Sequence, residues 1–229
     1  MKKLITLMLI TILVTGLTAC GNQQTEATTN TTDNEPTGVI ESTGESKILI
    51  VYFSVPEAVD ATGVAAVAGA SIVVSEGEKL GNTEYVAKVL QETTGGDLFR
   101  IETADDYPLD HEPLVAQAAD EQDQNFRPQL AGQIDDFEQY DTILLGFPNW
   151  WADMPMPIYS FLESYDFSGK TIIPFITHGG SGASKTLNSI SEIQPGASIR
   201  EDALVLSRND VGSSKDEIVK WADGLNLTP

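Results

Sequence analysis

The sequence predicts a doubly wound α/β fold in which a five-stranded parallel sheet carries helices on both faces. Apolar runs of strand length recur along residues 47–229, and stretches with helical periodicity alternate with them. The clearest strand pattern is apolar throughout instead of alternating, which is typical of strands buried on both faces of a parallel sheet. In such a sheet, ligands bind at the carboxyl ends of the strands.

The first predicted element is a strand over residues 47–53, where the sequence KILIVYF is nearly all apolar. Four further strands are expected over residues 98–101, 142–145, 171–176 and 203–206. Helices are expected over residues 83–91, 112–123, 158–165, 185–193 and 214–222. Pro155 and Pro157 suit the start of the third helix, because the first turn of a helix tolerates proline.

The amino-terminal region predicts an export signal followed by a tether. A basic start and sixteen uncharged residues, 4–19, indicate a signal peptide over residues 1–19. The sequence Leu17-Thr18-Ala19-Cys20-Gly21 resembles the cleavage box of bacterial lipoproteins, which implies lipidation of Cys20 at the extracytoplasmic face of a bacterial membrane. A chance cysteine beside an ordinary signal peptide is the alternative. Residues 20–46 are too polar to fold and are expected to form a flexible linker, so the folded domain is expected over residues 47–229.

Charge and cysteine content exclude several function classes. Thirteen Lys and Arg against thirty-four Asp and Glu give a net charge of −21, which repels nucleic-acid phosphates. The chain has one cysteine, so an intramolecular disulfide or a CxxC redox pair is impossible. No nucleic-acid partner is expected.

The first candidate site follows the first strand. Ser54 comes directly after it, and a long insertion, residues 55–80, then leads to Gly81, Asn82 and Thr83 at the head of a helix. Backbone N–H groups and hydroxyls at a helix start bind phosphate without a cation. Asn and Thr also cap helices routinely, so an ordinary cap is the alternative.

Two further candidate loops follow the third and fourth strands. Residues 146–151 place two tryptophans in a predicted loop above the sheet, where an indole ring can stack on a flat conjugated ring or pack into the core. Residues 178–182, His-Gly-Gly-Ser-Gly, form a glycine-rich turn whose backbone can approach a ligand closely.

Together these segments resemble the flavodoxin-like FMN-binding family, and specifically a bacterial branch whose phosphate loop is split between residues 52–54 and 81–84. The resemblance covers residues 47–229, and its most specific motifs are residues 148–155 and 178–182. It implies that Ser54, Gly81, Asn82 and Thr83 hold the FMN phosphate. It also implies that the isoalloxazine ring lies between one group, Pro148, Asn149, Trp150 and Trp151, and a second group, His178, Gly179, Gly180, Ser181 and Gly182. The sequence departs from the family in having no glycine at 148–151 and in replacing the carboxyl-terminal aromatic loop with residues 178–182.

Two other motifs do not support a site. Residues 168–171, Ser-Gly-Lys-Thr, lack the upstream glycine of a P-loop and precede a strand instead of a helix. His111 lies among Asp105, Asp106, Asp110 and Glu112, which is more typical of a solvated loop than of a metal site in so acidic a protein. No metal site and no catalytic acid–base group are predicted, so a flavin would carry the chemistry.

Three functions are compatible with the sequence. The first is a membrane-tethered FMN protein that transfers electrons between redox partner proteins or to small acceptors. The second is an NAD(P)H-dependent flavin or quinone reductase, although no dinucleotide fingerprint is present. The third is a flavin-free surface module that binds a protein or solute through the insertion over 55–80.

Overall fold

The computed structural model describes residues 48–58, 66–67 and 71–227, which belong to one compact unit, Pro36–Pro229. The predicted signal peptide over 1–19, the lipidation site Cys20 and the linker over 20–46 lie outside the described residues. Among the helices that are described, none has both the length and the apolar character needed to cross a bilayer.

The predicted parallel sheet is confirmed, with strands in the order β5-β1-β6-β7-β9. A two-residue strand, β8 (Ser198–Ile199), also pairs in parallel with the start of β7 and was not predicted. The chain leaves β1 to one side for β5 and returns on its other side for β6, so β1 and β6 flank the point where strand order reverses. The five main strands are β1 (Ile48–Tyr52), β5 (Asp97–Arg100), β6 (Thr142–Pro148), β7 (Thr171–His178) and β9 (Leu204–Ser207).

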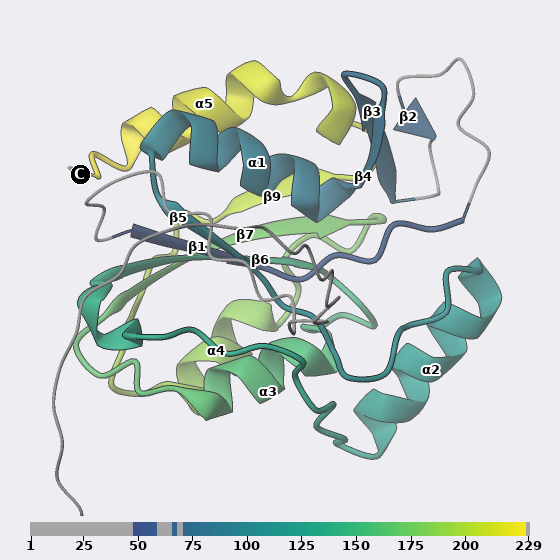
Figure 1. Ribbon diagram of the computed structural model, residues 1–229, viewed down its shortest axis with the longest axis horizontal. Coiled ribbons are helices and arrows are strands. Elements are labelled where there is room, and N and C mark those ends of the chain that lie inside the picture. Colours follow the sequence, from purple (N-terminus) through teal and green to yellow (C-terminus); the bar gives the residue numbers. More distant parts are fainter. Residues whose placement is uncertain (1–47, 59–65, 68–70, 228–229) are drawn as a thin grey trace, which may run out of the picture. The chain divides into compact units, whose positions relative to one another are not determined.

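Helices cover both faces of the sheet, as predicted (Figure 1). One face carries α1 (Asn82–Thr94) and α5 (Lys215–Gly224), and the other carries α3 (Met156–Ser164) and α4 (Thr186–Ile193). The remaining helix, α2 (His111–Asp123), lies beside these layers toward the carboxyl ends of the strands. There are also two short 3-10 helices, η1 (Phe137–Gln139) and η2 (Val211–Ser213).

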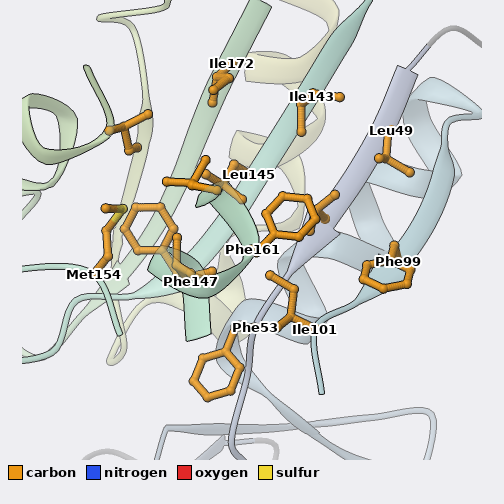
Figure 2. Packing of buried hydrophobic residues seen from close by; sticks show 14 of the residues in the cluster. Leu49, Phe53, Phe99, Ile101, Ile143, Leu145, Phe147, Met154, Phe161 and Ile172 are labelled. Atoms are coloured by element: carbon orange, nitrogen blue, oxygen red, sulfur yellow. The ribbon is translucent and has the colours of Figure 1, made fainter. Parts of the chain in front are cut away.

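Two apolar cores explain why the strands are apolar throughout. Successive residues of a strand point to opposite faces. Leu49 therefore packs with Leu145 and Phe161 in the core on the α3 and α4 face, which Figure 2 shows, whereas Ile50 packs in the core on the α1 and α5 face. All four side chains have no exposed surface.

The insertion over residues 55–80 contains strands that the sequence analysis did not predict. β2 (Ala66–Val67), β3 (Ile72–Ser75) and β4 (Glu78–Gly81) form a small antiparallel sheet. Glu76 and Gly77 connect β3 to β4 with positive φ angles of 51° and 86°, the geometry of a tight hairpin turn. The hairpin ends at Gly81, immediately before α1, and so holds the start of this helix in place.

Two predicted boundaries were wrong, because β6 and β7 are longer than their apolar runs. Their pairing continues from Gly146 opposite Phe175 to Pro148 opposite Thr177, so residues 146–148 and His178 are strand and not loop. Pairing of β6 with β1 ends at Gly146. Pro148 is therefore compatible with a central strand, because only one neighbouring strand extends that far.

Candidate functional site

A cleft of about 290 Å³ opens at the carboxyl ends of β1, β6 and β7. Its position beside the reversal of strand order is where open α/β sheets bind ligands. A much smaller cavity of about 20 Å³ adjoins the cleft. Two other predicted site residues, Ser54 and Thr83, line this small cavity. The predicted site residues that line the main cleft are Asn82, Pro148, Asn149, Trp150, Trp151, His178, Gly179 and Ser181.

The start of α1 forms one end of this cleft. Ser54 packs against Gly81 so closely that a Cβ added to Gly81 would lie 2.0 Å from the serine Oγ, so the approach requires glycine. The Gly81 N–H donates to Glu84, and the Asn82 N–H donates to the Ser71 carbonyl. The hydroxyl groups of Thr83 and Thr177 lie 2.9 Å apart in a buried hydrogen bond, which connects the helix to β7.

Residues 149–153, which follow β6 and are called the tryptophan loop below, form a tight turn without glycine. Trp150 and Asp153 exchange two backbone hydrogen bonds, and the intervening residues Trp151 and Ala152 have φ angles of 52° and 63°. Left-handed backbone is unfavourable for residues with a side chain, so surrounding contacts must hold the turn. Trp150 packs edge-on against Phe53, whereas Trp151 is 55% exposed at the cleft.

Asp153 supplies the principal side-chain contacts that hold this turn. Its carboxylate is buried and accepts hydrogen bonds from the hydroxyls of Tyr159 at 2.7 Å and Ser189 at 2.9 Å, with Lys185 Nζ 3.2 Å away. Burial, followed by the hydrogen bond from its hydroxyl to Asp153, raises the pKa of Tyr159 to about 12. The tyrosine therefore remains a proton donor throughout the neutral range and joins the turn to α3.

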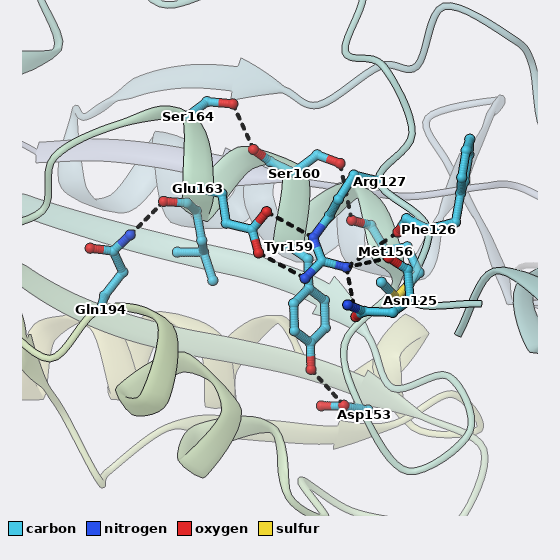
Figure 3. A network of polar contacts seen from close by, with 11 residues as sticks. Asn125, Phe126, Arg127, Asp153, Met156, Tyr159, Ser160, Glu163, Ser164 and Gln194 are labelled. Atoms are coloured by element: carbon cyan, nitrogen blue, oxygen red, sulfur yellow. Dashed lines mark hydrogen bonds and ion pairs between the residues drawn. The ribbon is translucent and has the colours of Figure 1, made fainter. Parts of the chain in front are cut away.

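The network extends from Tyr159 to the outer surface of α3 (Figure 3). The Arg127 guanidinium lies 4.8 Å from the centre of the Tyr159 ring and binds both carboxylate oxygens of Glu163, at 2.8 and 2.7 Å. The guanidinium contact therefore limits movement of the Tyr159 ring, whose hydroxyl bonds to Asp153. The turn is thus supported by α3 through Tyr159 and by α4 through Ser189.

The loop after β7 forms the opposite wall. Gly180 and Gly182 have φ angles of 134° and 62°, which L-residues with side chains rarely adopt. These two predicted site residues do not line the cleft and instead shape the loop. The Gly182 carbonyl accepts a hydrogen bond of 2.7 Å from the Asn149 amide, which ties this loop to the tryptophan loop.

Three buried side-chain oxygens within the described residues have no hydrogen-bond partner, the Oδ1 atoms of Asn82, Asn149 and Asp97. Asn82 and Asn149 line the cleft, whereas Asp97 does not. A buried acceptor without a donor costs about 1–3 kcal/mol, and a bound ligand that donates a hydrogen bond to it removes that cost. FMN carries ribityl hydroxyls and a ring N–H that can donate to these oxygens, and the residues present therefore fit this group.

Sequence reasoning missed several residues of the cleft. One wall comes from α2, through Leu114, Val115 and Ala118, and the indole N–H of Trp151 donates to the Val115 carbonyl at 3.2 Å. Glu57, Ser71, His111, Thr177 and Arg208 also line the cleft. Thr177 lies near the carboxyl end of β7 and Arg208 directly follows β9, so both could have been selected for that reason, but the position of α2 has no local sequence signal.

The two motifs that the sequence analysis set aside contact distant parts of the chain. The ammonium group of Lys170, at the start of β7, donates to the backbone carbonyls of residues 137, 138 and 140, the shortest contact being 2.6 Å to Tyr140. His111 contacts Glu57 through Nδ1 at 3.1 Å. Within the described ranges, no three His, Cys, Asp or Glu side chains gather in a way that could hold a metal ion.

Comparison with known proteins agrees with this architecture. A family model described as flavodoxin matches residues 71–225, whereas no curated protein matches the chain. A candidate flavoprotein of Bacteroides uniformis is 29% identical, with a TM-score of 0.57 over 78% of this chain and 98% of that one. A candidate flavoprotein of Bacteroides eggerthii is 26% identical, with a TM-score of 0.53 over 76% and 98%.

A more distant similarity involves a flavoprotein of Lactobacillus acidophilus solved in complex with FMN. It is 22% identical, with a TM-score of 0.47 over 75% of this chain and 97% of that one. The family match spans most of the chain, from β3 through α5, and the described residues form the doubly wound parallel sheet that the sequence resemblance implies. The chain therefore belongs to the flavodoxin family.

Proposed function

We propose that the cleft binds FMN and that the protein transfers electrons through it between redox partners. The observation that carries this proposal is the pair of buried, unpartnered amide oxygens, on Asn82 and Asn149, in a cleft at the reversal of strand order. Membership of the flavodoxin family supports the same ligand. FMN, when bound, supplies reversible uptake and release of electrons.

The roles of the residues follow from their positions. Ser54, Asn82 and Thr83 would bind the phosphate with their hydroxyl and side-chain amide groups at the start of α1. The tryptophan loop and the loop over residues 178–182 would hold the ring between them. Leu114 and Val115 of α2 would exclude water from the ring, while the exposed Trp151 marks an edge that a partner can reach.

The charge of the chain bears on its partners. A net charge of −21 favours encounter with cationic proteins or neutral acceptors and disfavours anionic ones such as NADPH. Arg208 is the only Lys or Arg among the described residues that line the main cleft. For these reasons an electron carrier is favoured over an NAD(P)H-dependent reductase.

A visible absorption spectrum of the purified protein, after incubation with FMN and removal of free ligand, tests the proposal. Retention of stoichiometric oxidised flavin is the expected result. The holoprotein should be reduced by dithionite and reoxidised by an electron acceptor, but should oxidise NADPH no faster than free FMN does. Saturable NADPH turnover above that control would favour the reductase, and absence of bound flavin would favour the flavin-free module.

Replacement of Thr83 with valine is expected to weaken FMN binding more than riboflavin binding. The change removes a hydroxyl donor, worth about 1–3 kcal/mol if its phosphate contact is buried. Binding of each flavin can be followed by quenching of flavin fluorescence. Thr93→Val, which removes a hydroxyl from the last turn of the same helix, is the matched control. Equal losses for the two ligands would show that Thr83 does not contact phosphate.

Lipidation of Cys20 would anchor the protein at the extracytoplasmic face of the membrane, with residues 20–46 as a spacer. The support is the position of this cysteine directly after the predicted signal peptide. Cys20→Ala is expected to release the protein into the soluble fraction or to leave it unprocessed, as judged by cell fractionation and by the mass of the product. Correctly cleaved protein that still sediments with membranes would contradict the anchor.

A further inference from the structure

The phosphate end of the cleft contains a carboxylate close to where a phosphate would bind. Glu57 lines the small cavity together with Ser54, Asn82 and Thr83, and it also lines the main cleft. Its side chain is only 8% exposed. A carboxylate and a phosphate at close range in a partly buried site repel each other strongly, so an anionic ligand here needs a compensating cation.

None of the described residues that line the small cavity is Lys or Arg. Lys79 comes near, but its ammonium group donates to the Glu57 backbone carbonyl and not to the carboxylate. Arg100 lies nearby, donating to the Ser54 carbonyl at 3.4 Å, but its guanidinium is within 3.7 Å of both Glu84 and Glu102. Arg208 lies against Gly179, in the loop that forms the opposite wall.

His111 is the cationic group that the geometry brings to Glu57. Its Nδ1 lies 3.1 Å from Glu57 Oε1, and both residues line the main cleft beside Asn82. The contact fixes Nδ1 and leaves Nε2 available to a ligand. A backbone hydrogen bond also joins the segment that carries Glu57 to the segment before α2, since the Ala58 N–H donates to the Leu109 carbonyl at 2.9 Å.

Resting on the proposed function, we propose that His111, oriented by Glu57, is the cation that pairs with the FMN phosphate and distinguishes FMN from riboflavin. The imidazolium offsets the carboxylate, and α2 thereby contributes to cofactor recognition at the end opposite the ring.

Several other ionisable groups lie around the pair formed by His111 and Glu57. Lys79 Nζ, from β4, donates to the Glu57 backbone carbonyl at 3.3 Å and not to its carboxylate. The charged or ionisable groups surrounding the pair are Lys79 on β4, Asp110 and Glu112 beside His111, and His178 and Arg208 on the far wall. The experiment is therefore based on substitutions of His111 and Glu57 themselves.

Dissociation constants of the full-length protein for FMN and for riboflavin test the inference. His111→Gln is expected to weaken FMN binding about tenfold and to change riboflavin binding less than twofold. In the His111→Gln background, Glu57→Gln should recover most of the lost FMN affinity, because it removes the uncompensated carboxylate. Glu112→Gln makes the same charge change on an exposed side chain of α2 and should shift FMN affinity less than twofold.

The outcomes separate this inference from the function on which it rests. Equal weakening of FMN and riboflavin by His111→Gln would mean that His111 only positions α2, and an unchanged FMN affinity would mean that His111 does not contact phosphate. Either result overturns the inference and leaves flavin binding intact. Failure of the wild-type protein to bind either flavin would overturn both proposals.

Discussion

Replacement of Gly146 with alanine is expected to destabilise the protein by about 2–3 kcal/mol, near the upper end of the range for overpacked cores. Gly146 lies in the centre of β6, and an added Cβ would lie 2.0 and 2.1 Å from two ring carbons of Phe175 on β7. The phenylalanine has no exposed surface and is enclosed by the core beneath α1, so its ring cannot move aside without displacing neighbours. Urea denaturation measures the loss of stability.

Two further variants identify the cause of the loss. Gly224→Ala introduces the same methyl group at the end of α5, where nothing lies within 4 Å, and should change the stability by less than about 0.5 kcal/mol. Phe175→Leu removes the ring from the path of the added Cβ, so the double variant should be more stable than the sum of the single effects implies. A Gly146→Ala protein as stable as the wild type would contradict this packing.

The sheet could be predicted from the sequence because burial on both faces produces a local signal. Residues 48–52 are all buried, and no exposed position interrupts the apolar run. The ends of β6 and β7 were missed because pairing continues beyond the apolar runs, through Gly146 and Pro148, whose residue types usually mark turns, and through His178. Backbone pairing with a neighbouring strand, which the residue type does not record, decides these boundaries.

The insertion was only partly accessible to sequence reasoning. Ile72, Val73 and Leu80 are buried, and Gly77 follows Glu76 between them, a pattern consistent with a tight hairpin. The strands have only two to four residues, too few to establish an alternating pattern.

The contacts of α2 could not be predicted from the sequence, because they depend on tertiary structure alone. The helix itself was predicted correctly, but its buried residues, among them Leu114 and Ala118, fit several possible faces of the protein. His111 and Glu57 are 54 positions apart, and their contact required the fold. The sequence therefore predicted the loops that border the cleft but not the wall that closes it.

Replacement of Asp153 with alanine is expected to destabilise the protein by about 2–4 kcal/mol and to weaken flavin binding at least tenfold. The change leaves the hydroxyls of Tyr159 and Ser189 without their acceptor, and each unsatisfied buried group carries a desolvation cost. It also removes the side chain that holds the left-handed residues Trp151 and Ala152, so the tryptophan loop loses the conformation that faces the cleft.

A graded series distinguishes the hydrogen bonds of Asp153 from its charge. Asp153→Asn keeps an oxygen that can accept one of the two hydroxyls and should cost about half as much as alanine. Lys185→Met removes only the ammonium partner, whose side chain is 62% exposed, and should change stability by less than about 1 kcal/mol. Urea denaturation and flavin titration of each variant measure both effects. If the alanine variant bound flavin as tightly as the wild type, the remaining contacts of the turn, among them the Trp150–Asp153 backbone hydrogen bonds and the bond from the Trp151 indole to the Val115 carbonyl, would be sufficient to hold its left-handed residues without Asp153.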